Sequence, residues 1–421
     1  MHTWPLFPVT VVGSLPRSQP LLNALRRRQA GRLSQTEFDS VAAQAVQEAV
    51  ALQEQVGVDI LSDGEQRRDN FYSFIVGHVD GIRLMSLAEM LDYVENKAAF
   101  ERLLNALDVP AFAIKNPVVI GPVQRREPLA LDEYQSLRTY TERPVKIALP
   151  GPYLLTRSMW VKRLSAAYYP TKESLGNDVV ALLRAELIAL RDAGCAFVQF
   201  DEPVLTEVAF AGPHATHTFM CAALSEKSSP EEELTFAVDL INRVVEGVEG
   251  IKTGLHVCRG NWSRQENVLL QGAYDPLIPY LSRMHVQQLV LEYATERAGS
   301  VEVLGDLPAD KEIGLGVCNP RSSDIESVDF MVGKVKALLR HRRPEQIYLN
   351  PDCGFGTFAE RPVNTTEVAI QKLQALHQAA MALRAVRCTP SSRPKLASHK
   401  LSYAPGLPPF SDTLPLGSDS R

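Results

Sequence analysis

The side chains with the clearest chemical potential are one histidine, one glutamate and two cysteines, each close to the end of a short apolar segment. His256 and Cys258 lie two residues apart, Glu292 ends a second such segment, and Cys353 follows a third. Residues two apart on a β-strand point to the same face of the sheet. Imidazole and thiolate ligands together favour Zn²⁺. If the three segments converge, the sequence predicts a four-ligand zinc site.

Such convergence requires a framework, and the chain carries a repeated pattern of a short β-rich segment followed by a stretch with helix start signals. Eight such alternations are typical of an α/β fold of the (β/α)8 TIM-barrel type. The predicted strands cover residues 9–13, 58–62, 145–149, 196–200, 252–257, 288–292, 313–317 and 347–350. The predicted helices include residues 34–55, 171–192, 231–248, 263–283, 323–340 and 364–384.

Carboxylates follow two of the predicted strands, at the barrel end where the chemistry of this fold takes place. Glu65 follows the second strand and Asp201 follows the fourth. A buried carboxylate needs a cationic partner, which the ammonium group of a substrate would supply. The alternative is a structural ion pair with Arg17, Arg67 or Arg68.

The spacing also indicates how the chain is divided. Residues 1–388 are predicted to form one catalytic barrel, with an insertion at about 67–143 after the second strand, because that stretch is too long for one barrel helix. The insertion is predicted to hold a helix over 86–107, a β-like turn at 118–123 and a second helix from residue 131; a smaller excursion covers 209–230. Residues 389–421 are rich in Pro, Ser and Leu without periodicity, which predicts a disordered tail.

Composition excludes several classes of protein. The net charge of −5 gives no electrostatic footprint for nucleic acid or an anionic membrane. No apolar stretch approaches the roughly 18 residues of a membrane span, and the first residues lack a signal-peptide pattern, so we expect a cytoplasmic protein. Six cysteines in a chain of 421 residues do not indicate a disulfide framework. We assign Cys195, Cys221 and Cys388 to packing and leave Cys318 open, because it also lies at a strand end.

Six short motifs, in order along the chain, resemble the catalytic barrel of the cobalamin-independent methionine synthase family, in its short single-barrel branch. The 61-residue separation of Glu292 and Cys353 fits the ligand spacing of that family. The resemblance runs from about residue 10 to residue 384. The motifs are Val11-Val12-Gly13-Ser14, Asp63-Gly64-Glu65, Gln199-Phe200-Asp201-Glu202-Pro203, His256-Val257-Cys258, Gly314-Leu315-Gly316-Val317 and Asn350-Pro351-Asp352-Cys353-Gly354.

The resemblance implies a zinc-dependent methyltransferase that methylates the thiol of homocysteine to form methionine. His256, Cys258, Glu292 and Cys353 would bind the Zn²⁺ ion. Two thiolates and a carboxylate leave the metal centre formally anionic, which suits it to hold an electron-rich thiolate rather than to activate water. Exchange of one ligand for the substrate thiol would lower the pKa of that thiol and supply a nucleophile at neutral pH.

The resemblance also assigns the substrate contacts. Glu65 and Asp201 would hold the ammonium group of homocysteine, and the backbone around Val12, Gly13 and Ser14 would hold its carboxylate. The methyl donor would be methyltetrahydrofolate or a methylcorrinoid.

The donor side departs from the family pattern at two places. Arg321 stands where the family carries a histidine that relays a proton to the folate, so Arg321 is our candidate for a catalytic group there. Trp160 lies two residues past the position of a tryptophan on which the pterin would stack. Without the relay, N5 of the folate is a poor leaving group, which favours a corrinoid or another alkyl donor.

Two other functions fit the same residues. The first is a related zinc-dependent thiol alkyltransferase that attacks a different electrophile, for example an epoxide with coenzyme M as the thiol. The second is a zinc-storage or scaffold protein without catalysis. The three hypotheses differ in whether the cavity binds an ammonium group and in whether the metal site is open to a thiol.

Overall fold

The computed structural model describes residues 4–93, 97, 115–210 and 228–388. Six parallel strands form a continuous sheet in the order β3-β4-β5-β6-β7-β8. They follow one another in the sequence, and each is buried along almost its whole length because helices cover the outer face. Their bounds are β3 Lys146–Pro150, β4 Phe197–Asp201, β5 Lys252–Val257, β6 Gln288–Glu292, β7 Glu312–Cys318 and β8 Ile347–Pro351.

Two short segments close this sheet into a barrel. Val9 forms a parallel bridge with Leu349 of β8, Thr10 pairs with Ile60, and Leu61 pairs with Val145 beside β3. With these two paired segments the barrel has eight strand positions, which confirms the predicted (β/α)8 barrel. The first two barrel strands are shorter than predicted, since only residues 9–10 and 60–61 pair with neighbouring strands. The residues after them turn away to build one end of the barrel.

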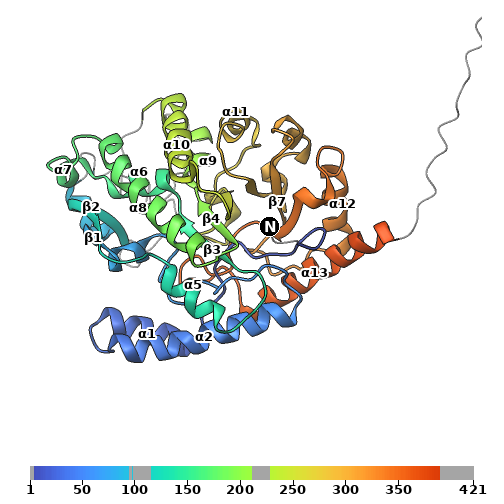
Figure 1. The fold of residues 1–421 in the computed structure, drawn as a ribbon, viewed down its shortest axis with the longest axis horizontal. Helices are drawn as coiled ribbons and strands as arrows, with labels where there is room; N and C mark the ends of the chain where they lie inside the picture. Colours follow the sequence, from blue (N-terminus) through green and yellow to red (C-terminus); the bar gives the residue numbers. More distant parts are fainter. Residues whose placement is uncertain (1–3, 94–96, 98–114, 211–227, 389–421) are drawn as a thin grey trace, which may run out of the picture.

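Helices surround the barrel, as Figure 1 shows. Three of the long ones begin at capping boxes, in which Ser34, Thr171 and Ser229 each accept a hydrogen bond from the backbone N–H three residues later. None of the helices in the described ranges is long and apolar enough to span a bilayer. The longer helices are α1 Gln19–Gln29, α2 Gln35–Gln55, α5 Leu131–Arg138, α6 Pro152–Met159, α8 Lys172–Asp192, α9 Val204–Phe210, α10 Pro230–Val245, α12 Val328–Leu338 and α13 Thr366–Cys388.

One predicted helix is wrong. Residues 263–283 contain two three-residue 3₁₀ turns, Glu266–Val268 and Asp275–Leu277, and the four-residue helix α11, Ile278–Leu281. Pro276 and Pro279 lack the backbone N–H groups that a continuous helix would need. The loop after β5 is therefore free to line the end of the barrel.

The segment between the second barrel strand, residues 60–61, and β3 contains an antiparallel hairpin. Strand β1, Val79–Ser86, pairs with β2, Lys115–Arg125, which includes the predicted β-like turn. Of the predicted helix over 86–107, the described residues include α3, Leu87–Met90, and a 3₁₀ turn, Leu91–Tyr93. Helix α5 begins at the predicted residue. The predicted tail and most of the predicted excursion over 209–230 lie outside the described residues.

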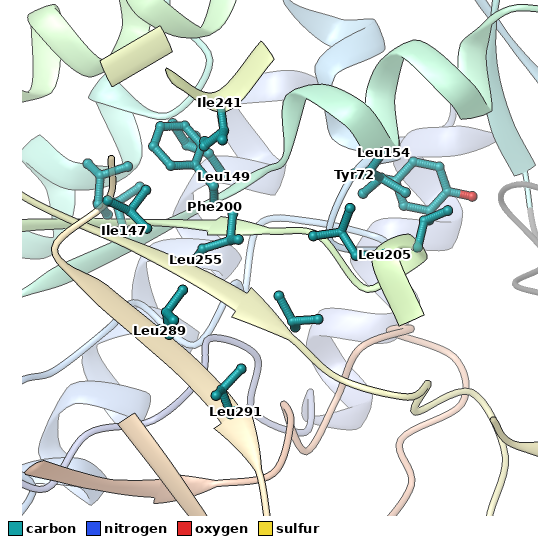
Figure 2. Packing of buried hydrophobic residues seen from close by; sticks show 14 of the residues in the cluster. Tyr72, Ile147, Leu149, Leu154, Phe200, Leu205, Ile241, Leu255, Leu289 and Leu291 are labelled. Carbon is teal, nitrogen blue, oxygen red and sulfur yellow. The ribbon is translucent and has the colours of Figure 1, made fainter. Parts of the chain in front are cut away.

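Alternation along the strands divides their side chains between two cores. Ile147, Leu149 and Leu255 belong to the large cluster between the barrel and its helices (Figure 2). Phe197 and Tyr348 belong to a separate small cluster on the other face of the strands. Further toward the carboxyl ends the inner positions become polar, which places polar side chains where an active site is expected.

Candidate active site

A cavity opens at the carboxyl ends of the strands. Most of the residues predicted from the sequence to bind metal and substrate line this cavity. None of its lining residues is a lysine or an arginine. The lining residues are Val12, Ser14, Glu65, Phe71, Tyr72, Asp201, Pro203, His256, Cys258, Asn261, Trp262, Cys353, Gly354, Thr357 and Phe358.

Three of the four predicted metal ligands meet in this cavity. Strand β5 carries His256 and presents Cys258 directly after its last residue, and Cys353 follows β8. One ligand atom from each residue lies within 4.8 Å of the other two, and the two sulfur atoms are 3.8 Å apart. All three residues are buried. This is the spacing of a site that can hold one metal ion.

The protonation of the cluster also suits a metal. The hydrogen bond with Cys353 and, against the effect of burial, the charge of His256 hold the pKa of Cys258 well below its usual range. The Nδ1 atom of His256 lies 3.3 Å from the backbone oxygen of Val290, and its Nε2 atom has no hydrogen-bond partner. A histidine whose Nδ1–H is held by a carbonyl offers Nε2 as a ligand.

Glu292 lies at the end of β6 but outside this three-residue cluster. Its carboxylate accepts a hydrogen bond from the backbone N–H of Arg259 at 2.8 Å and one from the Nε of Arg297 at 2.9 Å. Burial opposes ionisation, but the charges of Arg297 and Arg259 lower the pKa of Glu292. Arginines therefore hold the carboxylate beside the cluster and favour its ionised form.

Glu65 has the most constrained backbone in the cavity. Its φ angle is +53°, in the left-handed region that non-glycine residues seldom adopt. Asp63 accepts a hydrogen bond from its backbone N–H at 2.9 Å, and Arg17 donates one to its carbonyl at 2.7 Å. This support aims the side chain into the barrel, where the carboxylate oxygen Oε2 is buried without a partner. Burial raises the pKa of Glu65 to about 7.

Asp201 ends β4 and lines the same cavity. The side chain of Gln199 donates a hydrogen bond to it at 2.7 Å, and Lys146 in turn donates one to Gln199 at 2.9 Å. Burial raises the pKa of Asp201 to about 6, while His256 and Gln199 act in the opposite direction. Two carboxylates with raised pKa values thus share a cavity that offers them no lysine or arginine.

Two glycines make room for these groups. A Cβ atom on Gly13 would collide with the carboxylate of Glu65, and one on Gly354 would collide with the hydroxyl of Ser14. Val12 and Ser14 line the cavity on either side of Gly13. The predicted carboxylate-binding segment therefore lies against Glu65.

The remaining candidates do not line the cavity. Arg321 is buried beside it, with Nη1 3.3 Å from Oδ1 of the cavity residue Asn261. Trp160 uses its indole N–H on the backbone oxygen of Tyr169, 2.9 Å away. Cys318 is buried at the end of β7, outside the three-residue cluster, and burial raises the pKa of its thiol.

The sequence analysis missed the wall of the cavity. Phe71, Tyr72, Trp262 and Phe358 supply aromatic surface opposite the polar residues. Asn261 fixes the loop after β5, because its amide donates hydrogen bonds to Gly354 at 2.6 Å and to Thr357 at 2.9 Å. Asn261 and Trp262 lie three and four residues after Cys258, and this closeness to the motif was the signal that the sequence offered.

Fold and site together define an enzyme of one (β/α)8 barrel with a cysteine-rich, metal-capable centre at the carboxyl ends of its strands. Residues 7–381 match the family described as cobalamin-independent synthase, catalytic domain, and the chain belongs to this cobalamin-independent methionine synthase family. Its class is accordingly methyltransferase.

Relatives and solved structures agree with this assignment. The chain is 28% identical to a methionine synthase of Pyrococcus furiosus over 90% of its own length and 94% of the relative's. It is 27% identical to a methionine synthase of Sulfurisphaera tokodaii over 89% and 91% of the two chains. A B12-independent methionine synthase from Shewanella sp. W3-18-1, solved in complex with selenomethionine, shares the fold with a TM-score of 0.68 and 21% identity, covering 91% of this chain and 99% of that one.

Proposed function

We propose that this protein transfers a methyl group to the thiol of homocysteine and so forms methionine, with Zn²⁺ as its metal. The observation that carries the proposal is the meeting of His256, Cys258 and Cys353 within 4.8 Å of one another, in one cavity with Glu65 and Asp201. The names of the relatives, methionine synthases of similar length, support the same reaction.

The charge balance of the cavity supports both the metal and the substrate. Glu65, Asp201 and the two cysteines can all become anionic, while His256 is the one basic side chain among the lining residues. Buried anions need compensation. A divalent cation at the sulfur atoms and an ammonium group at the carboxylates would supply it. Homocysteine carries that ammonium group on the carbon three bonds from its sulfur.

The donor set fits Zn²⁺ in particular. Two thiols and an imidazole are ligands that zinc prefers, and the unpartnered Nε2 of His256 is the atom that would coordinate it. Bound there, Zn²⁺ stabilises a thiolate and makes it available at neutral pH. We propose Glu292 as the fourth ligand in the absence of substrate. Glu292 would complete the metal site, and Arg297 and Arg259 would hold its carboxylate in ion pairs when it is not a ligand.

The residues of the chain would orient the reaction. Glu65 and Asp201 hold the ammonium group, and the backbone around Val12, Gly13 and Ser14 receives the carboxylate, so the sulfur is directed at His256 and the two cysteines. After the thiol proton has left, the sulfur forms a bond to the methyl carbon while the bond from that carbon to the donor breaks. The aromatic wall excludes water from the nucleophile.

The alternative of an alkyltransferase acting on coenzyme M is weaker. Coenzyme M carries a sulfonate, and no lysine or arginine lines the cavity to receive it. Glu65 and Asp201 would instead repel that group. The same carboxylates attract the ammonium group of an amino-acid thiol.

An activity assay with two donors in parallel tests the proposal. We expect methionine to form from homocysteine with methyltetrahydrofolate or with methylcobalamin. Coenzyme M should be a poor acceptor with either donor, because its sulfonate would face two carboxylates. Alkylation of coenzyme M without methylation of homocysteine would show that the substrate class is wrong.

The binding of methionine should depend on pH in a defined direction. The pKa of Glu65 is raised to about 7 by burial, with Arg68 and Arg17 opposing the effect and Asp201 and Asp63 adding to it. Only the ionised carboxylate attracts the ammonium group of the ligand. In the zinc-free protein, methionine affinity should therefore increase roughly tenfold from pH 6 to pH 8, the change in the ionised fraction of one such group.

Calorimetric titration at each pH measures this effect. Methionine is suitable because it has no thiol that ionises in the same range. In Glu65→Gln the increase should fall to about twofold, since the amide does not titrate and only Asp201, with a pKa of about 6, still ionises over this range. Affinity that falls with rising pH in the unmodified protein would contradict the assignment.

A further inference from the structure

Two buried arginines lie directly behind the wall of the cavity, in loops that follow β6 and β7. The side chains of Arg297 and Arg321 are 6% and 1% exposed. Both make ion pairs with the same carboxylate, that of Glu266, which lies in the loop after β5. Arg321 Nε is 3.0 Å from Oε1 of Glu266, and Arg297 Nη1 is 3.2 Å from Oε2.

This arrangement has the features of a binding site for an oxyanion. The amide of Asn319 donates a third contact, 3.1 Å to Oε1 of Glu266, and Asn319 itself is fixed by the backbone N–H of Arg321 at 3.0 Å. Two guanidinium groups and an amide around one carboxylate match the way proteins bind carboxylates and phosphates. The group that they bind here belongs to the protein.

Arg321 retains unused capacity. Its Nη2 is buried without a hydrogen-bond partner, whereas the terminal nitrogens of Arg297 contact Glu266 and Glu292 as ion pairs. A buried guanidinium nitrogen without a partner costs free energy, and an additional oxyanion oxygen would recover it. Glu266 is a weak occupant, since its side chain is 44% exposed and lies in a three-residue 3₁₀ turn.

The arginine pair borders the reaction cavity. Asn261 lines the cavity and its side-chain oxygen is 3.3 Å from Nη1 of Arg321. A donor whose methyl group reaches the sulfur of homocysteine, bound beside Cys258 and Cys353, would therefore extend past Asn261 to the arginines. No lysine or arginine lines the cavity itself, and Arg321 is the cationic side chain that Asn261 contacts.

We propose that Arg297, Arg321 and Asn319 form a subsite for an oxyanion of the methyl donor, and that Glu266 occupies this subsite until the donor replaces it. The inference rests on the proposed methyl transfer and concerns its donor. The anion would be a glutamyl carboxylate of a methylfolate or the phosphodiester of a methylcorrinoid, two sources of the same chemistry. Arg321 and Arg297 are then positioning residues for the donor.

Opposite effects of two substitutions test the subsite. Arg321→Gln should raise the KM for the donor about tenfold, the usual effect of losing one charge-assisted hydrogen bond. Glu266→Gln should lower the same KM about threefold, because the neutral amide competes less well for the arginines. Arg321→Lys should restore part of the loss by restoring the charge. Arg340→Gln is the matched control, since Arg340 makes an ion pair with Glu302 at the surface.

Truncated donors identify the source of the anion. With a folate donor, 5,6-dimethyltetrahydropterin lacks the glutamyl carboxylates; with a corrinoid donor, methylcobinamide lacks the phosphodiester. The correct truncation should raise the KM as much as Arg321→Gln does, and the two changes together should add little, because they remove the same contact.

The outcomes separate this inference from the function on which it depends. Methionine formation in which neither Arg321→Gln nor Glu266→Gln changes the donor KM, or in which both raise it, would overturn the subsite and leave the function intact. Absence of methionine with every donor would remove the function instead. In that case, calorimetric titration of the holoenzyme with inorganic phosphate and with glutarate decides the subsite: tighter binding to Glu266→Gln supports it, and no binding to either protein rejects it.

Discussion

Replacing Cys353 by serine should remove most of the bound zinc and almost all methyl transfer. A serine hydroxyl is a far weaker zinc ligand than a thiolate, and Cys353 provides one of the ligand atoms that lie within 4.8 Å of one another. We expect less than about a tenth of an equivalent of zinc in the variant and a loss of activity of at least about a thousandfold. Metal analysis by mass spectrometry, on protein purified under reducing conditions, measures the first effect.

Cys318→Ser is the control for this experiment. Cys318 is also a buried cysteine at a strand end, but it lies outside the three-residue cluster. It should keep its zinc, although burial of the new hydroxyl will reduce stability. Circular dichroism of both variants separates loss of metal from loss of fold. Less than about half an equivalent of zinc in the unmodified protein would reject the metal assignment altogether.

Glu292→Gln extends the comparison to the proposed fourth ligand. Three ligands would remain, so we expect zinc to bind more weakly than in the unmodified protein but more tightly than in Cys353→Ser. Zinc affinity equal to that of the unmodified protein would limit Glu292 to its ion pairs with Arg259 and Arg297.

The sheet was the most predictable part of this protein. Strands β3 to β8 agree with their predicted ranges to within one residue at each end, because each is a short, mostly apolar segment followed by polar, glycine or proline residues. The bounds of the first two barrel strands were harder to predict, since their pairing is limited to two residues each. Ser14 pairs instead with Phe355, and Leu15 with Gly64, in contacts that join distant segments and leave no local pattern.

The predictions that were wrong concern residues whose side chains form ion pairs with residues distant in the sequence. The loop after β5 has helix-forming residues, but Glu266 pairs with Arg297 and Arg321, and prolines prevent a continuous helix. The orientation of Glu292 could not be predicted either. Its position along the chain fits the ligand spacing of the family, yet Arg297 and Arg259 hold the carboxylate beside the cluster of His256, Cys258 and Cys353. Spacing along the sequence identifies which residues can meet, whereas competing ion pairs decide how they are oriented.

Replacing Glu65 by glutamine should raise the KM for homocysteine by about a hundredfold. The unpartnered carboxylate oxygen of Glu65 is the proposed seat of the substrate ammonium group, and loss of a buried charge pair costs about 2 to 3 kcal/mol. Glutamine keeps the volume of the side chain, so the room that Gly13 provides is filled as before. Steady-state kinetics with homocysteine as the varied substrate measures the effect.

A substrate without the ammonium group is the matched control. 4-Mercaptobutyrate has the thiol and the carboxylate of homocysteine but no ammonium group, so Glu65→Gln should leave its KM unchanged or lower it. Asp201→Asn should raise the KM for homocysteine in the same way, and the double variant should lose less than the sum of the two effects, because both carboxylates would bind one ammonium group. An unchanged KM for homocysteine in both single variants would mean that the two carboxylates have a structural role in the barrel and do not bind the substrate. The proposal that the substrate is an amino-acid thiol would then lose its main support.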